Sequence, residues 1–457
     1  MASLVLGAVA TGAAPNPVPS AAQLAWTQHE LGIMVSYDMI TQLTDVPNPQ
    51  HFCIGAGGDK NLTVPPASAF NPTDLAAAPA QWMDVAESFG AKYAVYVAMH
   101  CSGFAQWPSK IYNYSLAQTA LADQDPLAAY FEAAKQRGIS PGLYVTWNYN
   151  ALFNVGEPGG RVQPGPLGPG QRSVTQAEYH DIALEVLSEV YTQYEGRVGE
   201  VWFDGGESDP GVSSLMQSTQ PQAVYMQGQA DDNNARIDGL ESGFLSQPVW
   251  SRGTAGKNNG GSPLGAHFVP VESDTPISEK DAWFWKPGQR YRPLQELQSV
   301  YVNSVGANAN LLLGVMPNAT GLIGQDQVDL LAQFGAWVKR CYGPGTAAAS
   351  AGPSVGPSVT LELPTGTVID RIIVQEDQSA GEQVASFSVE VSPPGGYKTE
   401  WIAAGSGESI GHKRIFFLPS GPIAATAVRI TVTSTLDGAP APAQVRWAAA
   451  EARSPCQ

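Results

Sequence analysis

The sequence contains few charged residues, and the basic ones are the scarcer. Charged residues make up 14% of the 457 residues, and 24 Lys and Arg stand against 41 Asp and Glu, so the formal net charge is −17. An acidic surface repels nucleic acids and anionic membranes, and we therefore expect neither as a partner. Hydrophobic residues make up 43% of the chain, which is enough for a large core and argues against disorder.

Motifs of several common chemistries are also absent. The six histidines form no His-x-x-x-His pair and the four cysteines show no metal-ligand spacing, so we expect no metal and no other cofactor. No Gly-x-Gly-x-x-Gly follows a predicted strand, which weakens a dinucleotide-binding fold. No Gly-x-Ser-x-Gly elbow follows one either, which weakens a Ser-His-Asp hydrolase. Chemistry based on carboxylates and aromatic rings remains.

Long apolar runs are scarce as well. Residues 2–15, ASLVLGAVATGAAP, are apolar but too short to span a bilayer. They resemble the apolar part of a secretory signal, although no basic segment precedes them. Residues 1–22 are therefore expected to be a leader or signal remnant, with a disordered leader as the alternative. Sequons at Asn61, Asn113 and Asn318 agree with a secreted glycoprotein.

The four cysteines allow three disulfide pairings, among which the sequence does not choose. A Cys341–Cys456 bond would tie the two ends of the C-terminal region together, and a Cys53–Cys101 bond would join two loops. The oligomeric state is likewise left open.

Between about residues 25 and 340, predicted helices and strands alternate. Helices are expected over 74–91, 125–138 and 175–196, and strands over 92–100, 142–147 and 198–205. Asp125 is a predicted N-cap before Pro126, and Thr175 with Glu178 makes a capping box. Strands that are apolar on both faces and alternate with helices belong in a parallel sheet. This α/β pattern favours a (β/α)₈-type barrel over residues 23–345, with a doubly wound sheet as the alternative.

The composition and the pattern of apolar residues change after Cys341. Residues 343–358 are rich in small residues and read as a linker, and short alternating runs separated by turn residues follow. Such runs are typical of an antiparallel β-sandwich, which we expect over residues 346–457.

One predicted strand ends abruptly in a carboxylate. Val201, Trp202 and Phe203 are apolar, Asp204 follows them, and two glycines come next. The C-terminal ends of barrel strands form the active-site face, so Asp204 is expected over a pocket, with a helix N-cap as the alternative. The chain has 11 Trp and 16 Tyr, and aromatic faces pack well against sugars. Retaining glycosidases use two carboxylates, one as nucleophile and one as acid and then base.

Three segments carry a family resemblance: AKYAVYVAMHCSGFAQWPSK at 91–110, VWFDG at 201–205, and VGANANLLLGVMPNATG at 305–321. Together they resemble glycoside hydrolase family 29, the α-L-fucosidases. Residues 373–391 also resemble the C-terminal sandwich of the plant-type subgroup, which favours α-1,3/1,4-linked fucose. The resemblance implies a retaining exo-α-L-fucosidase that acts on a fucosylated oligosaccharide or glycoprotein glycan by double displacement.

The same resemblance assigns roles to individual residues. Asp204 matches the nucleophile, and Glu241 is the first choice for the acid/base, with Glu272 the second. Predicted sugar contacts come from the matched segments and from residues at or near the ends of predicted strands: Tyr37, His100, Trp107, Trp147, Glu272, Trp283 and Trp285. For Trp107 and Trp147 a plain packing role is the alternative.

The chain also departs from the family pattern. Ser36 stands where a sugar-binding His is expected, and Cys101 and Ser102 replace a His and an Asp after His100. These departures concern hydroxyl contacts rather than the two carboxylates. Two alternatives therefore stay open: a related retaining α-glycosidase such as an α-L-galactosidase, and a non-catalytic carbohydrate-binding protein on the same scaffold.

Overall fold

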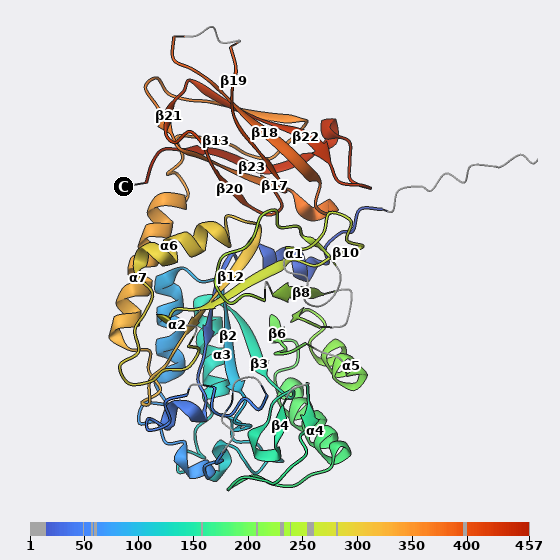
Figure 1. Cartoon of the computed structure of the whole chain (residues 1–457), viewed down its shortest axis with the longest axis vertical. Coiled ribbons are helices and arrows are strands. Elements are labelled where there is room, and N and C mark those ends of the chain that lie inside the picture. The colour runs from blue at the N-terminus through green and yellow to red at the C-terminus, as the bar shows by residue number, and fades with distance from the viewer. Residues whose placement is uncertain are drawn as a thin grey trace, which may run out of the picture.

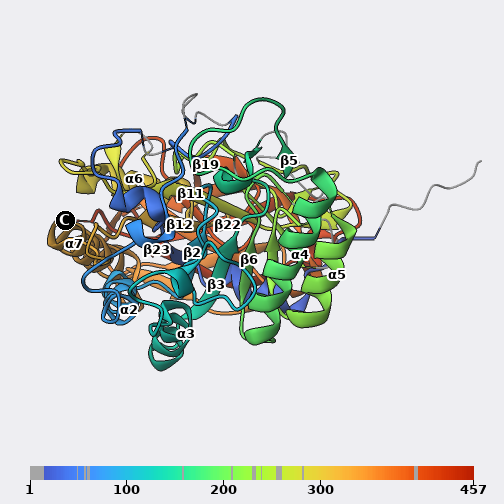
Figure 2. The ribbon, with the colours of Figure 1, turned by 90° about the horizontal axis from the view of Figure 1, so that it is seen from below.

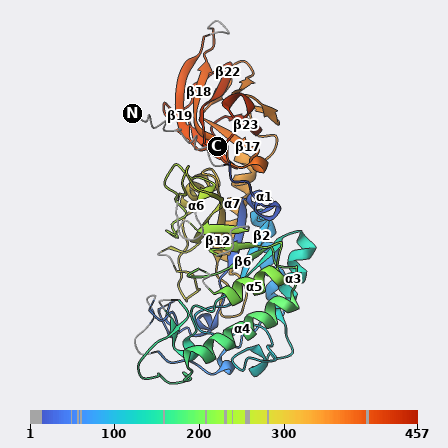
Figure 3. The same cartoon turned by 90° about the vertical axis from the view of Figure 1, so that its right-hand side faces the viewer.

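A closed parallel barrel and a stack of antiparallel sheets form the two ends of the molecule (Figures 1 and 3). The computed structural model describes residues 15–48, 50–55, 58, 62–156, 159–206, 209–228, 233–237, 239–253, 260–279, 282–395 and 400–456. The predicted leader therefore lies largely outside the described residues. The predicted combination of a barrel with a C-terminal β-sandwich is confirmed.

Eight strands close the barrel in the order β1-β12-β11-β8-β7-β6-β3-β2, and every neighbouring pair is parallel. They are β1 (Leu31–Val35), β2 (Tyr93–Met99), β3 (Ser140–Val145), β6 (Glu200–Trp202), β7 (Val224–Met226), β8 (Asn234–Ile237), β11 (Val271–Pro276) and β12 (Ala309–Val315). Two small hairpin-like pairs lie outside it: β4 (Val155–Gly156) with β5 (Arg161–Val162), and β9 (Arg252–Gly253) with β10 (His267–Phe268).

Helices surround the barrel incompletely. They are α1 (Ala21–Thr27), α2 (Ala78–Phe89), α3 (Pro126–Arg137), α4 (Gln176–Gln193), α5 (Pro210–Thr219), α6 (Leu294–Asn303) and α7 (Gln325–Tyr342). Figure 2 looks at the barrel from the end away from the sandwich and shows helices around the strands. Among the described residues no helix follows β7 or β8, so the (β/α)₈ pattern is interrupted there. Residues 227–233 are too few for a helical crossover between β7 and β8.

Local capping sets the helix ends as the sequence predicts. The Asp125 carboxylate accepts a hydrogen bond from the Ala128 amide at 2.9 Å, and Gly138 ends α3 in the left-handed region at φ 62°. Thr175 and Glu178 form the expected capping box before α4. These elements need no tertiary information, because each cap is made within one turn.

The C-terminal domain contains two main antiparallel sheets. One is β13 (Ala349–Ala351), β23 (Arg446–Arg453), β17 (Arg371–Glu376) and β20 (Arg414–Phe417), with β14 (Ser354–Val355) also paired to β23. The other is β15 (Ser358–Glu362), β22 (Ala427–Thr435), β18 (Val384–Ser392) and β19 (Ile402–Glu408); β16 (Val368–Ile369) pairs with β21 (Ile423–Ala424). Their facing side chains build a separate hydrophobic core that includes Phe387 and Trp447.

The expected linker over 343–358 is wrong for part of its length. Residues 349–351 and 354–355 form β13 and β14 against β23. Small side chains leave the backbone free to join a sheet edge, and the ladder of β23 supplies the hydrogen-bond partners that a sequence pattern does not show. Disulfides join Cys341 to Cys456 and Cys53 to Cys101.

The sandwich covers the N-terminal end of the barrel strands. Glu30, directly before β1, contacts His412 and Lys413, and Asn308, directly before β12, exchanges backbone and side-chain hydrogen bonds with the same segment. The sandwich thus stands opposite the end at which the barrel strands present their C-terminal residues. No helix among the described residues has the length and apolar character needed to cross a bilayer.

Candidate active site

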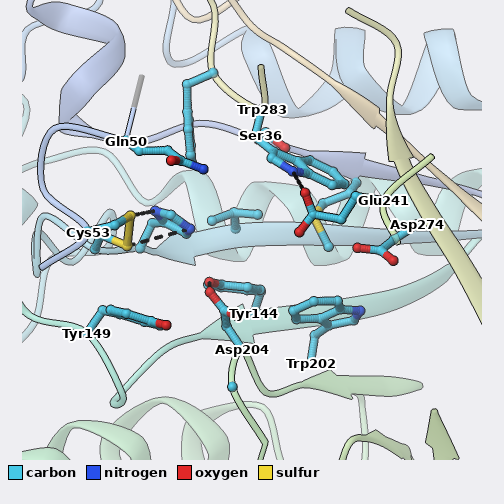
Figure 4. A pocket seen from close by; sticks show the side chains of 16 residues that line it. Ser36, Gln50, Cys53, Tyr144, Tyr149, Trp202, Asp204, Glu241, Asp274 and Trp283 are labelled. Carbon is cyan, nitrogen blue, oxygen red and sulfur yellow. Dashed lines mark hydrogen bonds between the residues drawn. A yellow bond between two sulfur atoms is a disulfide. The ribbon is translucent and has the colours of Figure 1, made fainter. Parts of the chain in front are cut away.

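A pocket of about 260 Å³ opens at the C-terminal end of the barrel strands (Figure 4). This is the end where barrels of this kind carry their chemistry. Three acids face it, Asp204, Glu241 and Asp274. Six rings surround them: His100, Tyr144, Tyr149, Trp202, Trp283 and Phe284. Such a volume and lining suit a ligand the size of one sugar residue.

Asp204 stands two residues beyond β6 on a turn that two glycines make possible. Gly205 and Gly206 adopt φ of 81° and 89°, a region that other residues enter only with strain. The Asn148 side-chain amide donates to the backbone oxygens of Asp204, at 2.6 Å, and Gly206, at 3.0 Å. The turn therefore lifts the carboxylate off the strand end and holds it over the pocket.

The Tyr144 hydroxyl donates to Asp204 Oδ2 at 2.8 Å. Burial, together with the charge of Asp204, raises the pKa of Tyr144 well above its usual value, so the hydroxyl stays protonated and keeps donating. Tyr144 stacks on Trp202 with ring centroids 5.3 Å apart and on His100 at 5.4 Å. The orientation of the Asp204 carboxylate is thus set by a packed row of rings.

Glu241 approaches the pocket from the segment after β8. Its backbone lies in the left-handed region at φ 50°, and its carbonyl accepts from the Thr275 hydroxyl at 2.8 Å. The Trp283 indole donates to Glu241 Oε2 at 2.9 Å. In Figure 4 the carboxylates of Asp204 and Glu241 both point into the space between the labelled side chains. A non-glycine residue held at positive φ beside a pocket is typical of a functional site.

Glu272 lies below the pocket rather than in it. It is fully buried and accepts hydrogen bonds from the Tyr93 hydroxyl at 2.8 Å and the Trp202 indole at 2.9 Å. Burial and the neighbouring Glu200 raise the pKa of Glu272 well above its usual value, while burial raises that of Glu200 to about 7. A carboxyl enclosed in this way cannot reach a glycosidic oxygen. The choice of Glu272 as acid/base or sugar contact therefore needs correction.

Asp274 is the pocket acid that the sequence reading missed. Successive strand residues alternate faces, so Glu272 and Asp274 both point into the barrel. At about 3.3 Å per residue, Asp274 stands about 7 Å further toward the open end. Of these two acids, only Asp274, which lies nearer the open end, lines the pocket. No strand was predicted over 271–276, so the alternation that separates the two acids was not visible in the sequence.

Of the predicted ring contacts, His100 and Trp283 line the pocket. Burial lowers the pKa of His100 to about 3, so its imidazole is neutral and offers one donor and one acceptor.

Besides Glu272, four predicted contacts, all aromatic, lie outside the pocket lining. Tyr37 packs against Phe70 and Trp82, because Ser36 faces inward and its neighbour must face the surrounding helices. The indole of Trp107 donates to Glu189 of α4 at 3.1 Å. These two side chains hold the barrel wall together.

Trp147 and Trp285 also lie elsewhere. The Trp147 carbonyl accepts from the Tyr179 hydroxyl at 2.5 Å, and its ring borders a separate small cavity against α4. Trp285 is half-buried and packs against the main core, while its neighbour Phe284 lines the pocket. For the neighbours Phe284 and Trp285, the prediction named the larger ring, but the backbone directs Phe284 into the pocket.

Further pocket residues carried no strong sequence signal. Tyr144 and Trp202 sit inside predicted strands and read as core, and Gln50 lies in a loop. Ser36 and Cys101, noticed as departures from the family pattern, prove to line the pocket.

One His and Cys group resembles a metal site in spacing. Ligand atoms of Cys53, His100 and Cys101 lie within 4.8 Å of one another. The two sulfurs are bonded to each other, so neither is a thiolate that could bind a metal. The chemistry of the described pocket is therefore that of carboxylates, hydroxyls and rings.

Comparison with known proteins gives one consistent result. Residues 65–343 match the family model described as alpha-L-fucosidase. The chain is 28% identical to Alpha-L-fucosidase 1 of Arabidopsis thaliana over 452 residues, covering 87% of this chain and 81% of that protein. It is 26% identical over 455 residues to a rice protein given the same name provisionally, covering 88% and 80%.

Solved structures agree. A crystal structure from Bacteroides thetaiotaomicron, provisionally named an α-L-fucosidase, has a TM-score of 0.81 at 28% identity and covers 96% of this chain and 100% of its own. A Ruminococcus gnavus GH29 fucosidase in complex with fucose has a TM-score of 0.74 at 19% identity and covers 98% and 97%. The second likeness concerns the fold alone.

Proposed function

Because this chain belongs to the α-L-fucosidase family, glycoside hydrolase family 29, and is thereby a glycoside hydrolase acting on fucosylated glycans, we propose that it removes terminal α-L-fucose with retention of configuration. The observation that carries the proposal is the Asp204 carboxylate, held by Tyr144 inside a ring-lined pocket that Glu241 also enters.

In the first step, a carboxylate oxygen of Asp204 attacks the anomeric carbon. The bond from that carbon to the glycosidic oxygen breaks, and protonated Glu241 gives its proton to the departing oxygen. A covalent fucosyl-enzyme remains. The hydroxyl of Tyr144, which donates to Oδ2, fixes the orientation of the Asp204 carboxylate in the pocket.

In the second step, Glu241 takes a proton from water, and the water oxygen attacks the same carbon. The bond to Asp204 breaks and fucose leaves with its original configuration. The Trp283 indole, which donates to Glu241 Oε2, holds the carboxyl in place through both steps. Two inversions at one carbon give net retention.

Azide tests both roles, since this small nucleophile needs no base. Asp204→Ala should abolish hydrolysis of an aryl α-L-fucoside, and azide should then give the β-fucosyl azide. Glu241→Ala should still form the fucosyl-enzyme from substrates with good leaving groups, and azide should give the α-fucosyl azide. Asp209 is the N-cap of α5 and lies outside the pocket lining, so Asp209→Asn is the matched control and should keep wild-type rates. A wild-type rate in Asp204→Ala would refute the mechanism.

We propose α-1,3/1,4-linked fucose as the natural substrate, because residues 373–391 resemble the C-terminal sandwich of the plant-type subgroup. Defined fucosylated oligosaccharides compared at equal concentration test the linkage. An aryl α-L-galactoside, which carries a hydroxyl on the carbon of the fucose methyl group, tests the sugar. Higher kcat/KM on that galactoside would replace fucose as the assigned substrate.

We also propose that the protein enters the secretory pathway. Two disulfides support an oxidising compartment, and Asn113, the acceptor residue of a sequon, is exposed. Fractionation of expressing cells, with glycosidase treatment of the recovered protein, tests this. Recovery in the cytosol with free thiols would contradict it.

A further inference from the structure

The disulfide between Cys53 and Cys101 forms part of the pocket wall. Both cysteines line the pocket, and their Cα atoms lie 5.0 Å apart. Cys101 directly follows His100 at the end of β2, whereas Cys53 belongs to the loop between β1 and α2. The bond therefore joins a mouth loop to the end of a barrel strand.

The disulfide also packs beside His100. Sγ of Cys53 lies 4.0 Å from Nδ1 of His100, and Sγ of Cys101 lies 4.0 Å from Nε2. The imidazole also packs against the rings of Phe284, with centroids 4.7 Å apart, and Tyr144. Because Tyr144 donates to Asp204, one packed row runs from the sulfurs to the catalytic carboxylate.

The same bond fixes the loop that brings Gln50 to the pocket. The Cys53 amide donates to the Gln50 carbonyl at 2.8 Å, and the Gln50 amide donates to Asn48 Oδ1 at 3.0 Å. The side chain of Gln50 lines the pocket rim from the loop side, as Figure 4 shows. A primary amide offers two donors and an acceptor to sugar hydroxyls.

We propose that the Cys53–Cys101 disulfide is a positioning element of the sugar site, holding Gln50 and His100 in their binding positions, and that its reduction weakens sugar binding. This rests on the proposed function only in taking a sugar as the ligand. Reduction by a dithiol breaks the Sγ–Sγ bond and moves two electrons and two protons to the sulfurs, which become thiols. The dithiol is oxidised to its own disulfide.

A purely stabilising cross-link would behave differently. The Cys341–Cys456 disulfide closes a longer segment, joins α7 to the C-terminal end of the sandwich, and is absent from the pocket lining. It is the matched control in the same molecule. Loss of either bond should lower stability, but only loss of Cys53–Cys101 should change sugar binding.

The main test compares the paired variants C53A/C101A and C341A/C456A with the oxidised wild type on an aryl α-L-fucoside. We expect KM to rise about tenfold in C53A/C101A, because losing one hydrogen bond to the sugar has roughly this effect. We expect kcat to change less than about threefold. C341A/C456A should keep the wild-type KM. Unchanged KM in folded C53A/C101A, or an equal rise in both variants, would overturn the proposal.

A double-mutant cycle tests whether the Cys53–Cys101 disulfide acts on sugar binding through Gln50. Gln50→Ala should raise KM by a similar factor in wild type and should add little in C53A/C101A, since both changes remove the same contact. Full additivity of the two effects would contradict the assignment of Gln50.

Wild-type protein gives the readout if C53A/C101A fails to fold. During brief dithiol treatment, KM should rise in proportion to the fraction of Cys53–Cys101 that mass spectrometry finds reduced, and reoxidation should restore it. Free fucose should slow reduction of this bond and leave that of Cys341–Cys456 unaffected. Complete reduction at constant KM would reject the proposal. Failure of oxidised wild type to turn over any α-L-fucoside would instead reject the proposed function.

Discussion

Asp204 and Glu272 are both carboxyl groups from barrel strands, yet the structure gives them different environments. Asp204 lines the open pocket and accepts from Tyr144, whereas Glu272 is enclosed with Tyr93, Trp202 and Glu200. Two buried carboxyls side by side cannot both ionise without a large cost, so one retains a proton. Glu272 therefore acts on the pocket only through Trp202, whose ring it fixes from below.

Glu272→Gln should lower kcat/KM about tenfold. The amide oxygen can still accept from Trp202, but the amide nitrogen, which donates to Glu200, cannot also accept from the Tyr93 hydroxyl. The loss should be equal for aryl fucosides with good and poor leaving groups, since Glu272 transfers no proton to them. Glu241→Gln, measured on the same series, should lose far more on poor leaving groups. A strong leaving-group dependence for Glu272→Gln would restore it as the acid/base.

Single residues also show how far the sequence could be read. The motif around Asp204 was sufficient to place this acid at a strand end. The sequence did not show whether Ser36 or Tyr37 faces the barrel interior, because the register of β1 decides this. Glu272 and Asp274 share one face of β11, and the pairing of β11 with β12 sets their depth in the barrel, so that Asp274 rather than Glu272 lies at the pocket.

At the scale of elements, the helices follow local signals closely. Asp125 and Gly138 bound α3, and the Tyr130 hydroxyl on that helix donates to the carbonyls of Ala94 and Gly142 in two neighbouring strands. Strands depended more on context. β13 and β14 form in a stretch of small residues because β23 offers an unfilled edge, and no pattern within 349–355 announces this.

Asp125→Ala should destabilise the protein by about 1 kcal/mol, since the first turn of α3 loses its side-chain acceptor. Asp125→Asn keeps an acceptor and should remain within a few tenths of a kcal/mol of the wild type. Denaturant midpoints measure both effects. KM and kcat should be unchanged in both variants, because α3 lies outside the barrel wall; a kinetic change would show that the helix acts on the site.

Across the whole molecule, the sandwich and the pocket occupy opposite ends of the barrel. The sandwich covers the N-terminal ends of the strands through Glu30, His412, Lys413 and Asn308. It places no described residue in the pocket lining. This arrangement favours a structural role for the sandwich, which shields the barrel end that carries no chemistry.

The ion pair at that interface predicts a pH dependence of stability. Burial alone would raise the pKa of Glu30, but the charge of Lys413 and the hydrogen bond from His412 lower it from 4.5 to about 2. A depressed carboxyl pKa stabilises the folded state above pH 4.5, by about 3 kcal/mol, and this stabilisation is lost as pH falls toward 2.

Glu30→Gln should therefore lower the melting temperature at pH 6 and reduce the difference between pH 6 and pH 3. Thermal unfolding at several pH values measures both. Glu132→Gln, which removes a partly exposed ion pair with Arg197, is the control and should change little. An unchanged pH profile in Glu30→Gln would show that other carboxyls dominate the acid transition.

The sequence by itself determined the ends of α3, the start of α4, the alternation of helix and strand, the two-part architecture and the acid after β6, because each depends on contacts within a few residues or on apolar periodicity. Only the tertiary structure decided which of two acids on β11 reaches the pocket, which rings face it, and that Cys53 meets Cys101 beside His100. Those outcomes depend on strand register and loop paths set by packing across the whole barrel, where the energies that choose between faces come from distant residues.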